Sequence, residues 1–346
     1  MYRWLQRLFS GPARAEPSDA PSPALPAAAP SAPVAAPLIR PAVPFDQLDQ
    51  AGRLYYRWLF DTDSETDLDI NAQESGALAA LTAIIDSQQS GAALVRRMPG
   101  MIPQLLQSLR SDSFSGARLS RTISNDVVLV AAVIRLANSS LAGSGTSISS
   151  VEHAVMLIGQ EGLRHLITSV AFRPIIDLNS GHFTRTLAPR IWDHSERCAV
   201  ANRALAESMG IDPFEAFLAG LVQNVGLIVS LRIMDQATKG DKGLGSEMFC
   251  AQLVNNARQL TCSIGREWHF PDNVTKAIAE QAGMKKDAIV SPLGRLLTLT
   301  DYLGKVRMLV ENDRAWPNDP ALFGGLPPFA ADAYRSLQPI DDAAAR

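Results

Sequence analysis

Two residues with reactive side chains, His194 and Cys198, lie four positions apart in this 346-residue sequence. On a helix they would share one face, where an imidazole and a thiolate could form half of a zinc site or a nucleophile with its base. A zinc site would need a second pair at suitable spacing, and a catalytic pair would need an oxyanion site. The sequence shows neither pattern. We therefore expect His194 and Cys198 to pack in a core.

The other candidates for chemistry are isolated in the sequence. Cys250 and Cys262 form no CxxC motif with Cys198, as is typical of reduced thiols in a cytosol. No glycine-rich phosphate loop follows a strand, which excludes nucleotide hydrolysis by that route. We expect His182 to lie in a loop and His269 to help end a helix.

The overall composition favours a globular protein in the cytoplasm. Apolar residues make up 47% of the chain and charged residues 19%, and the net charge is -3. This balance gives no basic field that would collect nucleic acid, so we expect no direct DNA binding. The longest apolar run, 127–134, is too short to cross a bilayer, and the N-terminus lacks the apolar core of a signal peptide. We therefore expect no transmembrane segment.

The elements that must position the candidate residues are helices. Apolar residues recur at helical spacing from about residue 70 to about residue 310, and no segment reads as a strand. Asp212, Pro213 and Glu215 form the pattern of a helix start, with an N-cap, a proline in the first turn and an acid at the third position. Ser291 followed by Pro292 forms another. The sequence therefore predicts an all-α protein with one compact multi-helix body.

Composition and periodicity divide the chain into five segments. They are a short amphipathic segment (1–10), a disordered linker rich in Pro and Ala (11–44), an N-terminal helical extension (45–90), the main helical domain (91–312) and a C-terminal tail (313–346). We expect the tail to lie along the surface or to be partly disordered.

A short sequence in the first segment recurs in the helical extension. Tyr-Arg-Trp-Leu occurs at 2–5 and again at 56–59. Aromatic anchors dock in grooves when a peptide helix binds a protein, so both copies could compete for one groove on the chain or on a partner. Residues 1–10 could also dock on a membrane surface. The candidate interaction anchors are Tyr2, Trp4, Leu5, Tyr56, Trp58 and Leu59.

Two stretches of the sequence together resemble an HDOD domain. The first contains LVRRMP at 94–99 and IRLANS at 134–139, and the second contains WDHS at 192–195, AFLAGLVQNVG at 216–226 and WHFP at 268–271. The resemblance spans about residues 90–310, which is most of the part that shows helical periodicity. It implies an all-α fold in which a helical bundle packs on a subdomain like that of HD phosphohydrolases. It also implies a bacterial regulator.

The resemblance brings with it a set of metal-ligand positions. An HD phosphohydrolase holds a divalent metal with a His, a later His-Asp pair and a distant Asp. The matching positions here are His194, then Gln223 and Asn224, then Asp301, so amides replace two of the four ligands. Neutral amides bind a hard cation weakly and cannot replace an imidazole nitrogen. The resemblance therefore implies a degenerate site without metal or other cofactor, and we expect the four residues to form a hydrogen-bonded cluster.

Three functions follow from this site, in decreasing order of support. The first is a non-enzymatic signal-transduction module that binds signalling proteins, whose identity the sequence does not reveal. The second is a sensor that binds a small signalling nucleotide in the altered pocket, with the basic pairs at 96–97 or 285–286 at its rim. The third is a residual metal-dependent phosphohydrolase. It has least support because only two of the four metal ligands remain, and the paired-His positions of some relatives, which are Glu280 and Gln281 here, cannot replace them.

Overall fold

The computed structural model of the chain describes residues 39–62, 69–86, 181–238, 243–317 and 319–337, and four single helical residues between 134 and 168. Within these ranges the regular elements are all helices, and one isolated bridge joins Ile39 to Val290. The prediction of an all-α fold is confirmed. The described helices are α2 (Phe45–Phe60), α3 (Ala72–Asp86), α8 (His182–Ala206), the 3-10 helix η3 (Glu207–Met209), α9 (Pro213–Val222), α10 (Val225–Thr238), α11 (Glu247–Glu267), α12 (Asp272–Ala279), α13 (Pro292–Glu311), α14 (Pro320–Phe323) and α15 (Ala330–Ser336).

Three predictions fall outside the described ranges. They concern the amphipathic segment 1–10 with its anchors Tyr2, Trp4 and Leu5, the linker as far as residue 38, and the family-like stretch between residues 94 and 139. The second family-like stretch, from residue 192 onward, lies inside them.

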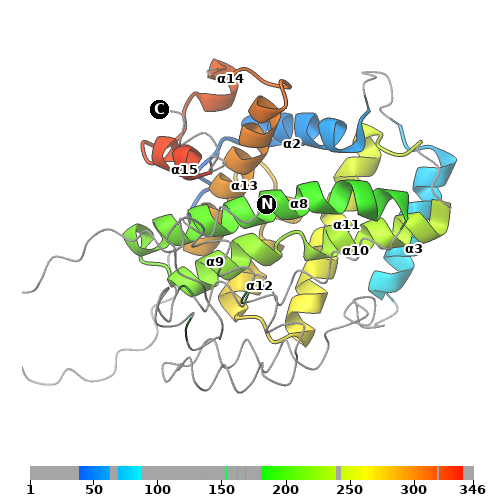
Figure 1. Cartoon of the computed structure of the whole chain (residues 1–346), viewed down its shortest axis with the longest axis horizontal. Coiled ribbons are helices and arrows are strands. Elements are labelled where there is room, and N and C mark those ends of the chain that lie inside the picture. Colours follow the sequence, from blue (N-terminus) through cyan, green and yellow to red (C-terminus); the bar gives the residue numbers. More distant parts are fainter. Residues whose placement is uncertain are drawn as a thin grey trace, which may run out of the picture.

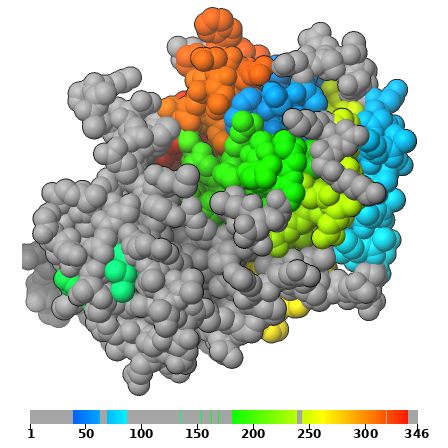
Figure 2. Space-filling view, turned by 45° about the vertical axis from the view of Figure 1, so that its right-hand side comes forward, coloured from blue at the N-terminus to red at the C-terminus, as the bar shows by residue number. Residues whose placement is uncertain are grey.

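Helix α8 runs through the middle of the molecule and packs against α9, α10 and α13 (Figure 1). Ile191, His194, Cys198 and Ala201 recur along it at helical spacing and are buried. Helix α13 crosses α8 and also packs against α2, so that the three helices lie side by side on one face (Figure 2). This arrangement brings His194 of α8 next to Asp301 of α13, with α2 packed against both helices.

The start of α8 differs from the sequence prediction. His182 is its first residue, so the prediction of a loop there was wrong. Asp235 of α10 accepts hydrogen bonds from the backbone N–H groups of Phe183 and Thr184, at 2.8 and 3.0 Å. A carboxylate at this place satisfies N–H groups that a helix start leaves free, and this tertiary contact extends the helix to His182.

The two predicted helix starts are confirmed. Asp212 caps α9 and accepts from the N–H of Glu215 at 2.7 Å, with Pro213 as the first helical residue. Ser291 caps α13 in the same way and accepts from the N–H of Gly294 at 3.1 Å. These local signals fix the start of α9, which leads to Gln223 and Asn224, and the start of α13, which carries Asp301.

Two helix crossings depend on the absence of a side chain. A Cβ atom at Gly220 of α9 would lie 2.5 Å from the backbone nitrogen of Ala199 in α8. A Cβ atom at Gly226 of α10 would meet the carbonyl oxygen of Ala257 in α11 and lie 2.7 Å from the nitrogen of Thr261. Glycine lets each pair of backbones touch, which sets the depth of α9 and α10 in the core.

One helical stretch in the described part, Pro213–Thr238, is long and apolar enough to cross a membrane by length and composition alone. Within the protein, 89% of its most apolar window is buried. The stretch comprises α9 and α10, which supply core residues between α8 and α11.

Helices α2 and α3, predicted as a separate extension, belong to the same core as the later helices. Tyr55, Leu59, Ala77 and Leu81 are buried in one cluster with residues of α8 to α13. The described helices therefore form one body from α2 onward.

Residues 39–44 were predicted to be the end of a disordered linker, and the structure corrects this boundary. Ile39 exchanges two backbone hydrogen bonds with Val290, at 2.7 and 2.9 Å, and Val43 is buried. The backbone bridge at Ile39 and the buried side chain of Val43 are enough to fix this segment on the domain. We call residues 39–44 the N-terminal strap.

The C-terminal tail is also more ordered than predicted as far as residue 337. It forms α14 and α15, which bury Leu322, Ala330 and Ala333 in a second apolar cluster with Val43 of the strap. The hydroxyl of Tyr302 in α13 donates to the carbonyl oxygen of Leu322 at 2.5 Å. The few apolar residues of the tail suffice because α13 presents a complementary surface.

A buried carboxylate ties α3 to the start of α11. Glu74 Oε1 accepts from the N–H groups of Gly245 and Ser246, at 2.8 and 2.7 Å, and Oε2 accepts from Ser246 Oγ at 2.7 Å. Oε2 also accepts from the N–H of Asn71, while Asn71 Oδ1 accepts from the N–H of Glu74, both at 2.9 Å. The same side chain thus closes a capping box at α3 and holds the loop before α11.

Glu74→Gln is expected to lower the free energy of unfolding by about 1–3 kcal/mol, because the amide nitrogen must face a donor group whichever way the side chain turns. Urea unfolding followed by circular dichroism measures the loss. Glu247→Gln is the matched control, since Glu247 meets Arg53 in a partly exposed ion pair of 3.4 Å that contributes little. Equal stability of the two variants would show that Glu74 does not stabilise the contact between α3 and the start of α11.

Candidate functional site

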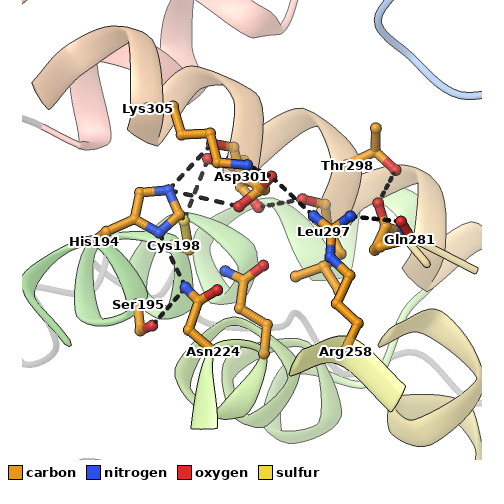
Figure 3. Close-up of polar contacts among 12 residues, drawn as sticks. His194, Ser195, Cys198, Asn224, Arg258, Gln281, Leu297, Thr298, Asp301 and Lys305 are labelled. Carbon is orange, nitrogen blue, oxygen red and sulfur yellow. Dashed lines mark hydrogen bonds and ion pairs between the residues drawn. The ribbon is translucent and has the colours of Figure 1, made fainter. Parts of the chain in front are cut away.

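His194 lies at the centre of the predicted site, on α8, with 1% of its surface exposed (Figure 3). Its Nε2 lies 3.2 Å from the carbonyl oxygen of Asp301, and its Nδ1 lies 3.3 Å from Nδ2 of Asn224. A carbonyl oxygen only accepts and an amide nitrogen only donates, so Nε2 carries the proton and Nδ1 accepts. Both ring nitrogens of a neutral imidazole are therefore engaged.

The two amides at the His-Asp positions take different places. Asn224 Nδ2 also donates to Ser195 Oγ at 3.0 Å, which fixes the amide between two residues of α8. Gln223 Nε2 donates to the carbonyl oxygen of Gly220 at 3.2 Å. Asn224 thus contacts His194 directly, whereas the Gln223 side chain turns to a backbone carbonyl group of α9.

Cys198 is a buried hydrogen-bond donor in this cluster. Its Sγ donates to the carbonyl oxygen of Thr300 at 3.3 Å and lies 3.6 Å from His194 Nε2. Burial raises the pKa of the Cys198 thiol well above its ordinary value. A neutral, enclosed thiol is a poor nucleophile, which agrees with the expected packing of His194 and Cys198 in the core.

Asp301 of α13 carries the negative charge of the site, and a cluster of cations surrounds it. Lys305, one turn further along α13, places Nζ 2.6 Å from Asp301 Oδ2. Arg258 of α11 places Nη2 3.7 Å from the same oxygen, and His194 Nε2 lies 3.7 Å from Oδ1. Lys305 and Asp301 are 7% and 6% exposed, so this is a buried ion pair.

The charges of this pair follow from its surroundings. Burial alone would raise the pKa of Asp301, but the attraction of Lys305 and Arg258 outweighs burial and lowers that pKa below its ordinary value. Burial would lower the pKa of Lys305, and the attraction of Asp301 outweighs it and raises that pKa. The pair is therefore a carboxylate and an ammonium ion. The ammonium also lies 5.3 Å from the centre of the Tyr56 ring and 5.8 Å from that of Tyr55.

The residues of this cluster do not fit a divalent metal. Both nitrogens of His194 are turned to protein groups, and the Lys305 ammonium lies against Oδ2 of Asp301. Among the described residues, no three side chains of the types His, Cys, Asp and Glu gather closely enough to share an ion. Structural zinc uses four protein ligands and catalytic zinc three, so the donor set falls short.

The positions of a second His pair have structural roles. Glu280 Oε2 accepts from the backbone N–H and the hydroxyl of Ser291, at 2.9 and 2.8 Å. Gln281 donates to the carbonyl oxygens of Ala277 and Gly294 and accepts from Thr298 Oγ1, at 3.0, 3.2 and 2.8 Å. Both side chains hold α12 against the start of α13.

Acid is expected to destabilise the protein through His194. Burial lowers the pKa of His194 below its ordinary value. As pH falls below about 6.5, the unfolded chain takes up a proton at this residue, while the folded protein stays neutral until the pH reaches the lower, folded pKa. The stability that neutral His194 contributes is therefore present above about pH 6.5 and is lost on the acid side of it.

Melting temperatures between about pH 7.5 and about pH 5 test this dependence. His194→Gln should melt at a lower temperature at neutral pH and should show a flatter pH dependence than the natural protein. His269→Asn, a change of an exposed histidine next to α11, should keep the natural slope. The same slope in His194→Gln and the natural protein would contradict the assignment.

The described interaction anchors lie in α2. Tyr56 and Leu59 are buried, and the Arg190 guanidinium lies 5.1 Å from the centre of the Trp58 ring. The copy at 56–59 is therefore already packed within the domain. Competition by residues 2–5 would require α2 to leave, and it stays a prediction.

Sequence reasoning missed two cations of this region, Lys305 and Arg258. Lys305 stands four positions after Asp301, a spacing that signals an ion pair on a helix. That signal was available, but such pairs are most often exposed. Arg258 comes from α11, and nothing local in the sequence connects it to Asp301.

The sequence profile of the HDOD domain matches residues 95–284, more than half of the chain. The chain belongs to the HDOD domain family. The matched range contains His194, Gln223 and Asn224 but ends before α13, so Asp301 and Lys305 lie outside it.

Solved structures share the HDOD fold at low identity. A Marinobacter aquaeolei VT8 protein, provisionally named a signal transduction protein, is 18% identical with a TM-score of 0.54, covering 82% of this chain and 66% of its own. A Shewanella amazonensis SB2B protein, provisionally named a metal-dependent phosphohydrolase, is 19% identical with a TM-score of 0.50, covering 77% and 98%. At these identities the likeness shows the fold alone.

One curated relative is an uncharacterized protein of Treponema pallidum (strain Nichols). It is 21% identical over 165 residues, which cover 47% of this chain and 30% of the relative. The chain therefore spans less than a third of that relative's length.

Proposed function

We propose that this HDOD protein is a non-catalytic signal-transduction module that acts by binding other signalling proteins. The observation that carries the proposal is the Lys305 ammonium, 2.6 Å from the carboxylate of Asp301. In the HD frame this carboxylate would be a metal ligand. An internal cation that neutralises it takes over the electrostatic role of a metal but activates no water.

The rest of the cluster supports the same conclusion. The Asn224 amide engages the His194 nitrogen Nδ1, and the neutral imidazole tautomer directs its other nitrogen to a backbone carbonyl. Protein groups thus satisfy both ring nitrogens of His194, as expected of a buried polar cluster that stabilises a fold. Family membership and the name of the Marinobacter aquaeolei protein support a role in signalling.

Metal analysis tests the non-catalytic part of the proposal. The natural protein is incubated with Mn²⁺, desalted and assayed for bound metal and for hydrolysis of p-nitrophenyl phosphate. We expect substoichiometric metal and no hydrolysis above that of the Asp301→Asn variant. A triple variant, Gln223→His, Asn224→Asp and Lys305→Ala, restores the donors and should gain metal. One equivalent of metal and turnover in the natural protein would overturn the proposal.

Crosslinking and affinity capture from a bacterial lysate test the binding part. The full chain is compared with a variant that lacks residues 1–38, which keeps the Ile39–Val290 bridge. A captured signalling protein must then bind the purified chain in a saturable titration. If candidates captured by both forms fail that titration, the partner role is contradicted.

A further inference from the structure

A hollow of about 220 Å³ opens beside the Lys305–Asp301 pair, between α2, α11 and α13. Helix α2 contributes lining residues at 48, 49, 52, 53, 56 and 57, which is one face of the helix. Asp301 and Lys305 line its inner end. The hollow thus shares α11 and α13 with the cluster around Asp301, and α2 forms its other wall.

The lining carries an excess of positive charge. Its basic residues are Arg53, Arg57, Arg258 and Lys305, and its acidic residues are Asp49, Glu247 and Asp301, so four positive minus three negative charges leave one positive. Lys305 is paired with Asp301, and Arg53 meets both Asp49 and Glu247, at 3.2 and 3.4 Å. Two guanidinium groups, Arg57 and Arg258, are therefore less fully neutralised.

These two guanidinium groups give the hollow its anion chemistry. No ion pair or hydrogen bond joins the Arg57 side chain to another described residue, and Arg258 uses Nη1 on the carbonyl oxygen of Gln281 at 2.5 Å and reaches Asp301 at 3.7 Å only. A guanidinium group binds phosphate through paired N–H donors. An anion between Arg57 and Arg258 would complete the charge balance.

The other walls favour an organic body rather than a bare ion. Leu48, Ala251, Val254 and Met284 supply apolar surface, and the Tyr56 ring adjoins them. The volume lies below the range of about 300–1,000 Å³ that is usual for drug-sized ligands. It suits a molecule no larger than a mononucleotide.

We propose that this hollow binds a small organic phosphate, with the phosphate near Arg57 and Arg258 and the organic part against the apolar wall. The inference rests on the proposed non-catalytic role, because the phosphate is bound as a signal and is not hydrolysed. Since α2 forms one wall, an occupant ties α2 to α11 and α13.

Gly52 provides a way to close the hollow without touching a charge. It lines the hollow, and a Cβ atom added there meets nothing within 4 Å. Gly52→Leu should therefore fold, with a gain in helix propensity, and its side chain should fill the ligand space. Gly76 of α3 is exposed and equally unobstructed, so Gly76→Leu is the matched control away from the hollow.

The experiment is calorimetric titration and thermal shift of the full chain with AMP, GMP, CMP, UMP and glucose 6-phosphate, with adenosine and inorganic phosphate as comparison ligands. We expect at least one organic phosphate to bind and to raise the melting temperature, and adenosine and inorganic phosphate to bind at least about tenfold more weakly. Gly52→Leu and Arg57→Gln should each weaken binding by about tenfold or more, and Gly76→Leu should leave it unchanged.

The outcomes separate this inference from the proposed function. No binding by any organic phosphate, or binding that survives Gly52→Leu, would overturn the inference and leave the partner role intact. Chromatography of the recovered ligand gives the second readout. A ligand that binds in the hollow but returns hydrolysed would overturn the non-catalytic role.

Discussion

Lys305→Met is expected to destabilise the protein by about 3–5 kcal/mol, because it leaves the buried carboxylate of Asp301 without its nearest cation. Methionine keeps the length and apolar stem of lysine, so the loss reports the missing charge more than missing volume. The nearest remaining positive side chain would be Arg258, at 3.7 Å and with its other nitrogen already bound to Gln281. Urea unfolding followed by circular dichroism at pH 7 measures the change.

The double variant Lys305→Met with Asp301→Asn is the control for this prediction. It removes both charges together, and replacing a whole buried pair costs far less than breaking it. We expect it to recover most of the stability lost in Lys305→Met. If Lys305→Met alone stays within about 1 kcal/mol of the natural protein, the ion pair does not hold the site.

Gly226→Ala is expected to cost more than about 3 kcal/mol or to prevent folding. The added methyl group would meet backbone atoms of Ala257 and Thr261 in α11, and backbone in a helix cannot turn aside as a side chain can. Separating α10 from α11 would also break the hydrogen bond of 2.9 Å from the Gly226 N–H to Thr261 Oγ1. Expression, melting temperature and urea unfolding measure the effect.

Gly52→Ala is the matched control, since it adds the same methyl group to a helical glycine with open space around it. Because alanine favours the helix over glycine, this variant should gain about 0.5–1 kcal/mol. Opposite signs for the two substitutions are the expected result. A mild effect of Gly226→Ala would mean that the crossing of α10 and α11 is looser than the structure indicates.

Much of the fold could be predicted because its signals are local. The caps at Asp212 and Ser291 and the helical spacing of apolar residues lie within a few positions of one another, and the structure confirms them. The order of the strap and tail could not be predicted in this way. Val43 and Leu322 are single apolar residues with no periodic pattern around them, and they are buried only because distant helices, chiefly α13, form an apolar surface there.

The candidate site likewise contains residues that could be predicted from the sequence and residues that could not. The resemblance placed His194, Asn224 and Asp301 at matching positions, and the structure brings these three together. The charge that completes the cluster comes from Lys305 and Arg258, which no motif marks. Whether a helical Asp and Lys four positions apart form an exposed pair or a buried one depends on what covers them, and here α2 and α11 do so.

The Glu74 junction has a consequence for how the chain is made. The carboxylate and its partners Gly245 and Ser246 are separated by 171 and 172 positions. During synthesis, which proceeds from the N-terminus, Glu74 leaves the ribosome long before residue 246 exists. At about 5–20 residues per second this interval lasts on the order of ten seconds. Until then α3 has neither its loop nor its core partners, so the nascent chain carries an unfinished core that a chaperone could bind.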